Sequence, residues 1–257
     1  MNFQKIKYLP LFVIIIFVFS CNNTELVSSQ KAKEHDSIRI KRLFLNDDKI
    51  EYDLSNYMKM SRINRFDREI ENFLISDAQN FPEKGQILFT GSSSIRIWKS
   101  LQEDMDGLQT IRRGFGGATI PEIINYSEQI IFPYEPSKII FYCGENDHYI
   151  NSSYKIYESF QIIERLIHKR LPETKLYFVS IKPSIARKTM WKQMSGTNRI
   201  IKEYTKITPK TYYIDVASAM FNDNFSIKKD IFISDKLHMN NKGYDIWTAI
   251  IKPILMK

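Results

Sequence analysis

The sequence predicts an α/β protein in which a parallel β-sheet is covered by helices on both faces. From residue 61 onward, short apolar runs of strand length alternate with amphipathic segments of helix length. Polar motifs follow the apolar runs, at the positions where a parallel sheet presents the carboxyl ends of its strands. With 257 residues, 43% of them hydrophobic, the chain is long enough for one well-packed domain or two small ones. It shows no internal repeat of the kind that builds solenoids or propellers.

The N-terminal part of this predicted domain contains two helices and three strands. A helix over 65–79 is predicted because apolar residues recur there at three- and four-residue spacing. Apolar runs predict strands over 86–90 ("QILFT"), 108–113 ("LQTIRR") and 138–143 ("KIIFYC"). Between the last two strands, the segment 120–132 has a helical pattern and carries a proline near its start.

The C-terminal part continues the same alternation of helices and strands. The segment 154–171 is a strongly amphipathic helix, and the apolar run "KLYFVSI" predicts a strand over 175–181. A helix over 195–207 precedes a fifth strand over 211–216 ("TYYIDV"), and a closing helix is expected near 242–255.

The beginning of the chain has the features of an export signal. Two lysines precede an apolar stretch over 8–19, which Ser20 and Cys21 follow. A membrane-spanning helix needs roughly 20 apolar residues, so this stretch is interpreted as a signal peptide over 1–20. The letters "VFSC" resemble a bacterial lipobox, whose cysteine becomes the first mature residue and receives a diacylglycerol.

An ordinary cleaved signal, with an unmodified Cys21 in the mature chain, is the alternative. The only other cysteine is Cys143, in an apolar run, so an unmodified Cys21 would be an odd thiol in an exported protein. Lipidation of Cys21 by several acyl chains, such as palmitate, would instead give a stable membrane anchor. We therefore expect an exported, membrane-anchored lipoprotein of the cell envelope, facing the periplasm or the surface.

Residues 22–60 are polar and weakly periodic, which is typical of a tether and N-terminal extension before a domain over 61–257. The formal charge of +8 falls to +6 without residues 1–20, which carry two lysines and no acid. Lysine and arginine are spread along the chain with no run of five or six. A solvated basic surface is therefore favoured, and no nucleic-acid partner is expected.

One polar motif, "TGSSS" at 90–94, ends an apolar run on three consecutive hydroxyls. A serine hydroxyl is a weak nucleophile unless a base activates it and a third group orients that base. Of the four histidines, His238 follows Asp235 by three residues in "SDKLH", a spacing that brings a carboxylate to Nδ1 of the ring. His148, in "GENDHY", remains a second possible base.

Hydrolysis of an ester also needs N–H donors for the negative charge that develops on the carbonyl oxygen. The motif "GFGGAT" at 114–119 offers the backbone N–H groups of Gly116 and Gly117, and "GEND" at 144–147 offers the amide of Asn146. Turn formation is the alternative explanation of both motifs. A nucleotide-binding loop is excluded because the third glycine of Gly-x-Gly-x-x-Gly is missing.

Taken together and in order, the four motifs resemble the four blocks of the SGNH/GDSL hydrolase family. The resemblance extends over about Phe66 to Leu255 and includes "ILFTGSSSIRIW", "VSIKPS" and "LHMNNKGYDIW". It implies a three-layer α/β/α sandwich of flavodoxin-like type with five parallel strands. It further implies that Ser93 is the nucleophile, His238 the base and Asp235 the acid. The implied oxyanion donors are the N–H of Ser93, the N–H of Gly117 and the side chain of Asn146.

Two positions depart from the family pattern. Ser92 stands where the family has aspartate, which leaves three neighbouring hydroxyls, Ser92, Ser93 and Ser94, as possible nucleophiles. Arg112 stands where many members have asparagine, and a structural role is expected for it.

The resemblance predicts a serine esterase that hydrolyses short-chain or acetyl esters of a carbohydrate or lipid. No cofactor and no metal are expected, because the remaining acids and histidines lack ligand-like spacing. An acyl or leaving-group pocket is predicted to be lined by Phe115, Tyr149, His148 and Trp98, with ordinary core packing as the alternative. Two other functions stay open: an acyltransferase using the same residues, and a non-catalytic surface lipoprotein that binds glycans or lipids. The sequence determines neither the ester nor the oligomeric state.

Overall fold

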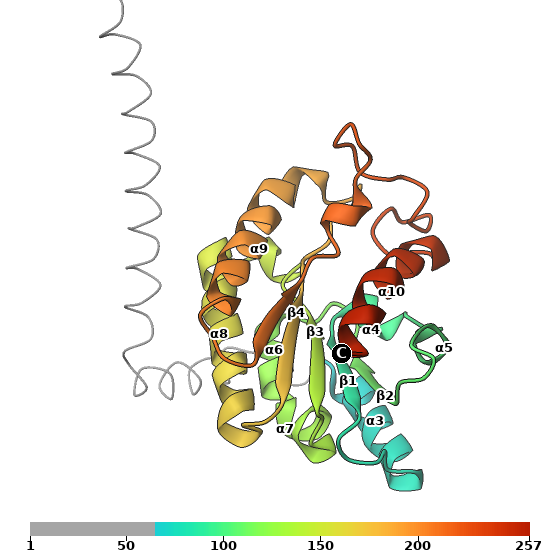
Figure 1. Ribbon diagram of the computed structural model, residues 1–257, viewed down its shortest axis with the longest axis vertical. Coiled ribbons are helices and arrows are strands. Elements are labelled where there is room, and N and C mark those ends of the chain that lie inside the picture. The colour runs from blue at the N-terminus through green and yellow to red at the C-terminus, as the bar shows by residue number, and fades with distance from the viewer. Residues whose placement is uncertain (1–64) are drawn as a thin grey trace, which may run out of the picture. The chain divides into compact units, whose positions relative to one another are not determined.

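Five parallel strands form one sheet in the computed structural model, which describes residues 65–257 (Figure 1). In chain order the strands are β1 Ile87–Gly91, β2 Thr110–Gly114, β3 Lys138–Tyr142, β4 Lys175–Val179 and β5 Thr211–Ile214. Their order across the sheet is β2-β1-β3-β4-β5, and every pairing is parallel. The carboxyl ends of β2, β1 and β3 are therefore neighbours at the same end of the sheet.

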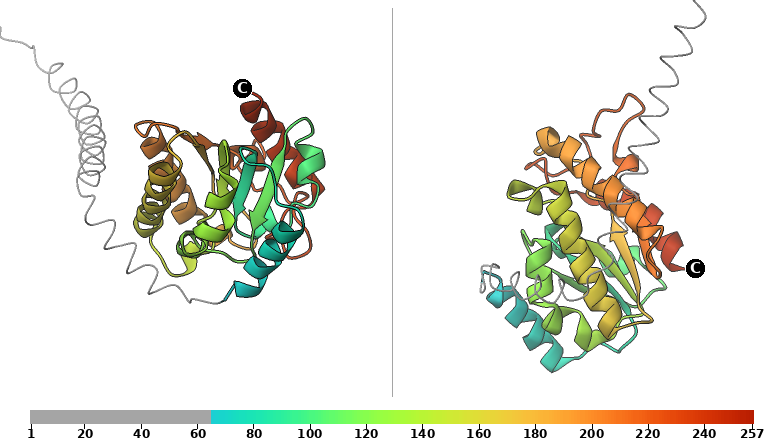
Figure 2. Two further views of the ribbon diagram at one scale, coloured as in Figure 1. Left: turned by 90° about the horizontal axis from the view of Figure 1, so that it is seen from below. Right: turned by 90° about the vertical axis from the view of Figure 1, so that its left-hand side faces the viewer.

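Helices cover both faces of this sheet (Figures 1 and 2). Their bounds are α3 Asp67–Gln79, α4 Ser93–Arg96, α5 Leu101–Asp104, α6 Ile120–Asn125, α7 Ser127–Ile130, α8 Ser153–Arg170, α9 Trp191–Thr205 and α10 Asn241–Leu255. Short 3₁₀ turns lie at Phe132–Tyr134, Asp147–Tyr149, Lys188–Met190 and Ser218–Met220. This is the predicted three-layer α/β/α arrangement.

Two consecutive residues of β3 show which helices lie on which face. Phe141 contacts Phe160 of α8, with ring centroids 6.0 Å apart. Tyr142 contacts Trp247 of α10, with centroids 4.9 Å apart. Because successive strand residues point to opposite faces, α8 and α10 cover opposite sides of the sheet. Helix α9 packs beside α8, and α4 and α5 share the α10 side (Figure 1).

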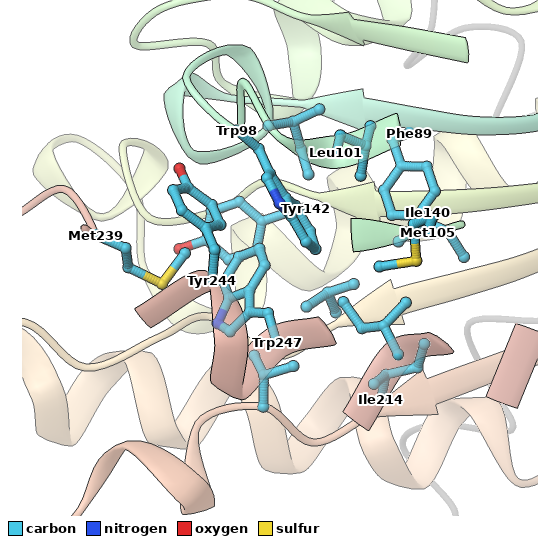
Figure 3. Packing of buried hydrophobic residues seen from close by; sticks show 14 of the residues in the cluster. Phe89, Trp98, Leu101, Met105, Ile140, Tyr142, Ile214, Met239, Tyr244 and Trp247 are labelled. Atoms are coloured by element: carbon cyan, nitrogen blue, oxygen red, sulfur yellow. The ribbon is translucent and has the colours of Figure 1, made fainter. Parts of the chain in front are cut away.

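The core on the α10 side is built mainly from large aromatic side chains (Figure 3). Trp98 stacks on Tyr244 with ring centroids 5.0 Å apart and meets Phe89 and Trp247 edge to face. Arg112 of β2 donates a hydrogen bond to the carbonyl oxygen of Trp98. This contact gives Arg112 the structural role that was expected for it.

The strands and most helices lie where the apolar pattern predicts them, within a few residues, but two helices differ. The predicted helix over 120–132 is divided into α6, α7 and a 3₁₀ turn. The hydroxyl of Ser127 donates to the carbonyl oxygen of Ile124 at 2.7 Å, and Pro133 has no N–H to continue a helix. Helix α9 begins four residues before the predicted start, at Trp191 rather than at residue 195.

The predictions of a signal peptide over 1–20, of a lipidated Cys21 and of a tether over 22–60 lie outside the described residues. Within residues 65–257, no helix combines the length and the apolar character that crossing a bilayer requires.

Replacement of Gly91 by alanine is expected to destabilise the fold strongly. Gly91 ends β1 with a φ of +136°, and a Cβ there would lie 1.9 Å from the carbonyl oxygen of Tyr142 in the neighbouring strand. Strain and overpacking together predict a loss of roughly 2–5 kcal/mol in the free energy of unfolding. Urea unfolding of the full chain, followed by circular dichroism, measures this loss.

Gly107→Ala is the matched control. Gly107 also has a positive φ, +86°, but a Cβ there would meet no atom within 4 Å. Its replacement should cost only the left-handed backbone term of about 1–2 kcal/mol. Equal losses for the two variants would contradict the steric explanation at Gly91.

Candidate active site

The three consecutive serines after β1 have different environments. Ser92 and Ser94 are each 1% exposed, whereas Ser93 is partly exposed at the first position of α4. The N–H of Ser92 donates to the carbonyl oxygen of Tyr142 at 2.9 Å, which continues the strand pairing one residue beyond β1. Only the Ser93 hydroxyl therefore emerges at the edge of the sheet.

His238 meets Ser93 from a segment 145 residues later in the chain. Nε2 of His238 lies 2.9 Å from Oγ of Ser93, and Nδ1 of the same ring lies 2.5 Å from Oδ2 of Asp235. The structure thus brings the predicted nucleophile, base and acid into one hydrogen-bonded chain. With Nδ1–H directed at the carboxylate, Nε2 is left to accept the serine proton.

A tight turn holds Asp235 and His238 in this relation. Oδ1 of Asp235 accepts the main-chain N–H groups of Leu237 and His238, both at 2.9 Å, and Lys236 adopts a left-handed φ of 58°. Partial burial opposes ionisation of Asp235, but the hydrogen bonds from His238 and Leu237 hold its pKa below the usual value. Asp235 is therefore ionised, and its negative charge can stabilise a proton on the neighbouring imidazole.

The predicted oxyanion donors lie on the loops that follow β1, β2 and β3, which are adjacent in the sheet. Gly117, after β2, has a φ of +76°, a conformation that glycine adopts readily. Within residues 65–257, the N–H groups of Ser93 and Gly117 have no protein acceptor. Both remain available to an oxygen atom of a substrate.

Asn146, after β3, is held at both ends of its side-chain amide. Its Nδ2 donates to the carbonyl oxygen of Ala118 at 3.0 Å, and its Oδ1 accepts a hydrogen bond from Nη2 of Arg187 at 3.0 Å. An amide nitrogen carries two protons, so one N–H of Asn146 remains for a further acceptor. The bond to Ala118 also places this amide beside Gly117.

Two of the four predicted pocket residues do not line a pocket. Trp98, in the short segment between α4 and α5, is fully buried because it packs among the aromatic residues of the core (Figure 3). Phe115 is also fully buried, with its ring 4.7 Å from that of Phe66 and 5.9 Å from that of Tyr126. For both residues the predicted pocket role was wrong, and they are core residues.

The other two pocket candidates differ in exposure. His148 is buried, its Nε2 lies 3.1 Å from the hydroxyl of Thr197, and burial lowers its pKa to about 4. The Ser93 hydroxyl contacts His238 and not His148, so the structure favours His238 as the base. Tyr149 is 65% exposed, and its hydroxyl accepts a hydrogen bond from Nε of Arg187 at 3.1 Å. Of the four, Tyr149 alone offers a broad surface to a substrate.

Glu145, the residue before Asn146, belongs to a buried charged cluster that the sequence motifs did not predict. The carboxylate of Glu145 lies 3.0 Å from Nζ of Lys182 and 3.1 Å from Nη1 of Arg187, and it accepts the hydroxyl proton of Tyr142 at 2.7 Å. Burial raises the pKa of Glu145, but the two cations and the hydrogen bonds outweigh this effect and hold it below the usual value. A lysine at the end of the apolar run "KLYFVSIK" was the available signal for a buried ion pair.

No group of three or more His, Cys, Asp or Glu side chains in residues 65–257 is arranged to hold a metal ion. The functional groups gathered at the site are those of serine, histidine, aspartate, asparagine and backbone amides, the set that acyl transfer through a serine requires.

No protein-family model and no curated protein matches the chain. Among solved structures, it resembles a protein from Bacteroides fragilis assigned as an acylhydrolase, with a TM-score of 0.60 and 17% identity over 76% of this chain and 96% of that one. A GDSL-like lipase from Bacteroides thetaiotaomicron matches with a TM-score of 0.60 and 18% identity, covering 73% and 97% of the two chains. An acetyl-xylooligosaccharide esterase from Geobacillus stearothermophilus matches with a TM-score of 0.53 and 14% identity, covering 65% and 93%.

These matches establish the fold. The chain shares its five-stranded parallel sheet with helices on both faces with these acylhydrolase, GDSL-like lipase and acetyl esterase structures, which is the fold that the sequence resemblance implied.

Asp147, directly after Asn146 in the chain, carries a fully buried carboxyl group. Its Oδ1 accepts the main-chain N–H of Ile120, at the start of α6, at 3.0 Å. Burial raises the pKa of Asp147 to about 7, although the Ile120 N–H favours the ionised form. This carboxyl group thus fastens the loop after β2 to the loop after β3.

Replacement of Asp147 by asparagine is expected to remove a pH-dependent loss of stability. The unfolded chain ionises this carboxyl near pH 3.8, whereas the folded protein retains the proton up to about pH 7. Ionisation therefore favours the unfolded state, and the free energy of unfolding falls as pH rises between these values. Relative to the wild type, Asp147→Asn should gain stability across this range and then stay level. Urea unfolding at a series of pH values measures the difference.

The same substitution at the exposed Asp223 controls for the change in net charge. A stability difference between Asp147→Asn and the wild type that does not change with pH would contradict the raised pKa of Asp147.

Proposed function

We propose that the protein is a serine esterase that hydrolyses acyl esters through an acyl-enzyme. The observation that carries this proposal is the contact of Ser93, His238 and Asp235, at 2.9 and 2.5 Å, between segments far apart in the chain. The shared fold with acylhydrolases, lipases and acetyl esterases supports it.

In the proposed reaction, Nε2 of His238 takes the hydroxyl proton of Ser93 as Oγ attacks the ester carbonyl carbon. Asp235 keeps the ring in the required tautomer and stabilises the imidazolium that forms. The carbonyl oxygen becomes negatively charged and accepts hydrogen bonds from the N–H groups of Ser93, Gly117 and Asn146. Collapse of this intermediate breaks the ester C–O bond, and His238 returns the proton to the leaving alcohol. Water then attacks the acyl-enzyme by the same sequence and releases the acid.

We further propose a short-chain or acetyl ester of a carbohydrate or lipid as the substrate. The exposed ring of Tyr149 is joined to Asn146 through Arg187, so an aromatic surface lies near the proposed oxyanion donor. Aromatic faces of this kind pack against both sugar rings and acyl chains. The similarity in fold to an acetyl-xylooligosaccharide esterase and to a GDSL-like lipase is in keeping with an ester of a carbohydrate or of a lipid.

Replacement of Ser93 by alanine is expected to abolish hydrolysis of p-nitrophenyl acetate by the full chain in detergent. Loss of a triad member typically lowers kcat by about 10⁴-fold or more. His238→Gln should cause a similar loss, because the hydroxyl then has no base. Steady-state kinetics measure both losses.

Ser94→Ala is the matched control, because Ser94 is the buried neighbour whose main-chain carbonyl, not its side chain, binds Tyr244. It should retain activity. Full activity in Ser93→Ala or in His238→Gln would refute the proposed function. A panel of esters with acyl chains of increasing length then defines the acyl preference, and formation of an acylated sugar when an acceptor is added would indicate the acyltransferase instead.

We also propose that Cys21 carries a lipid and anchors the protein in a cell-envelope membrane. The export-signal pattern over 1–20 and the lipobox-like "VFSC" support this proposal. Expressed in a bacterium fed an alkyne-labelled palmitate, the wild-type chain should take up label and partition into detergent, whereas Cys21→Ser should do neither. Cys143→Ser is the control and should be labelled like the wild type. Label in Cys21→Ser would contradict the proposed anchor.

A further inference from the structure

Arg187 touches three residues of one short segment after β3. This side chain is 9% exposed and lies in the loop that follows β4. Its Nη1 pairs with Glu145 at 3.1 Å, its Nη2 donates to Oδ1 of Asn146 at 3.0 Å, and its Nε donates to the hydroxyl of Tyr149 at 3.1 Å. A single guanidinium thus uses each of its nitrogens on a different residue between 145 and 149.

The loop that carries Arg187 also touches the turn that holds the base. The N–H of Ala186 donates to the carbonyl oxygen of Lys236 at 3.1 Å, and Lys236 lies between Asp235 and His238. The loop of Arg187 is therefore bonded to the turn of Asp235 and His238, while the Arg187 side chain is bonded to Asn146, the proposed oxyanion donor.

The chemistry of the contact determines which way the Asn146 amide faces. A guanidinium only donates hydrogen bonds, so Nη2 of Arg187 requires the amide oxygen on its side. Nδ2 then faces the carbonyl oxygen of Ala118, which only accepts. A flipped amide would place donor against donor at Arg187 and acceptor against acceptor at Ala118. Asn146 is partly buried, and a polar group left unpaired away from water is costly, so the observed orientation is favoured.

Arg187 is not required to neutralise Glu145 by itself. Lys182 and the hydroxyl of Tyr142 also bind this carboxylate, with distances of 3.0 and 2.7 Å. Loss of the Arg187 guanidinium leaves Glu145 paired with a cation, whereas Oδ1 of Asn146 has no other partner among the described residues. Only Arg187 supplies the contact with Asn146, and the same holds for the contact with the hydroxyl of the exposed Tyr149.

We propose that Arg187 is a positioning residue for ester hydrolysis, which acts by holding the Asn146 amide with its free N–H toward the oxyanion. This inference rests on the proposed function, because it takes Asn146 as an oxyanion donor. It gives Arg187 a role in the stabilisation of the transition state without contact with the substrate. The effect of Arg187 on kcat should therefore pass through Asn146, whereas its contact with Tyr149 would act on substrate binding and so on KM.

A double-mutant cycle with Arg187→Met and Asn146→Ala in the full chain tests this dependence. Asn146→Ala should lower kcat for p-nitrophenyl acetate by about 10²–10³-fold, the usual effect of deleting one oxyanion donor. Arg187→Met should lower kcat by about 10-fold to 100-fold, because the interaction it supports forms in the transition state, and any change in KM reports on its contact with Tyr149. The double variant should be no slower than Asn146→Ala alone.

Arg187→Lys provides the conservative rescue. Its single ammonium can still donate to Oδ1 of Asn146 but lacks the fork that reaches three partners, so kcat should recover in part. Arg170→Met removes an arginine whose partner is the exposed Glu128, outside the site, and should leave kcat unchanged. If Arg187→Met does not fold, by circular dichroism, the cycle is run with Arg187→Lys in its place.

Two results would overturn the role of Arg187. One is a wild-type kcat in Arg187→Met, and the other is losses that multiply in the double variant, because multiplied losses mean independent actions. Ser93→Ala is measured in parallel. If Ser93→Ala keeps its activity, the proposed function fails; if it is inactive while the cycle shows multiplied losses, only the inference about Arg187 fails.

Discussion

Helix α10 packs Tyr244 and Trp247 against Trp98, and this aromatic contact determines where His238 lies. His238 occupies the turn just before α10, so it moves with the start of that helix. Each large side chain buried in this way stabilises the fold by about 2–3 kcal/mol, whereas a hydrogen bond contributes about 0.5–1.5 kcal/mol net. The hydrogen bond to Ser93 therefore results from the packing of the helix and does not by itself hold the two segments together.

A second set of contacts joins the loops that follow β2 and β3. The carbonyl oxygen of Ala118 accepts hydrogen bonds from Asn146 and from the thiol of Cys143, and Asp147 accepts the N–H of Ile120. The contacts of Cys143 and Asp147 are buried and that of Asn146 is partly buried. An unpaired donor or acceptor in a buried position costs about 1–3 kcal/mol. The two loops are consequently held in one relative position, so the N–H groups proposed to stabilise the oxyanion are arranged before any ester binds.

The charged cluster at Glu145 shows how the fold tolerates ions in its interior close to this site. Removal of a carboxylate and two cations from water is expensive, and good geometry with further hydrogen bonds is needed to offset the cost. The cluster joins the loop after β3 to the loop after β4 through Lys182 and Arg187. Replacement of such clusters by apolar residues is often neutral for stability, so a role in positioning is the better reason for this one. The contact of Arg187 with Asn146 is in keeping with that view.

The sequence by itself determined the strands, the main helices, the family resemblance and the set of polar motifs at the strand ends. Those features depend on local spacing of apolar residues and on residue types a few positions apart, which a linear pattern records. The family resemblance implied Ser93 as the nucleophile but left Ser92 and Ser94 open. The tertiary structure separates the three, because only the Ser93 hydroxyl is left partly exposed.

The tertiary structure also decided the division of the helix over 120–132, the burial of Trp98 and Phe115 in the core, and the partners of Arg187. The local sequence around an aromatic residue near a motif is the same whether its side chain faces a substrate or the core. Arg187 and Asn146 lie 41 positions apart and meet only because β3 and β4 are neighbours in the sheet. Contacts of this kind depend on how the strands are ordered and packed, and residue spacing along the chain does not record that order.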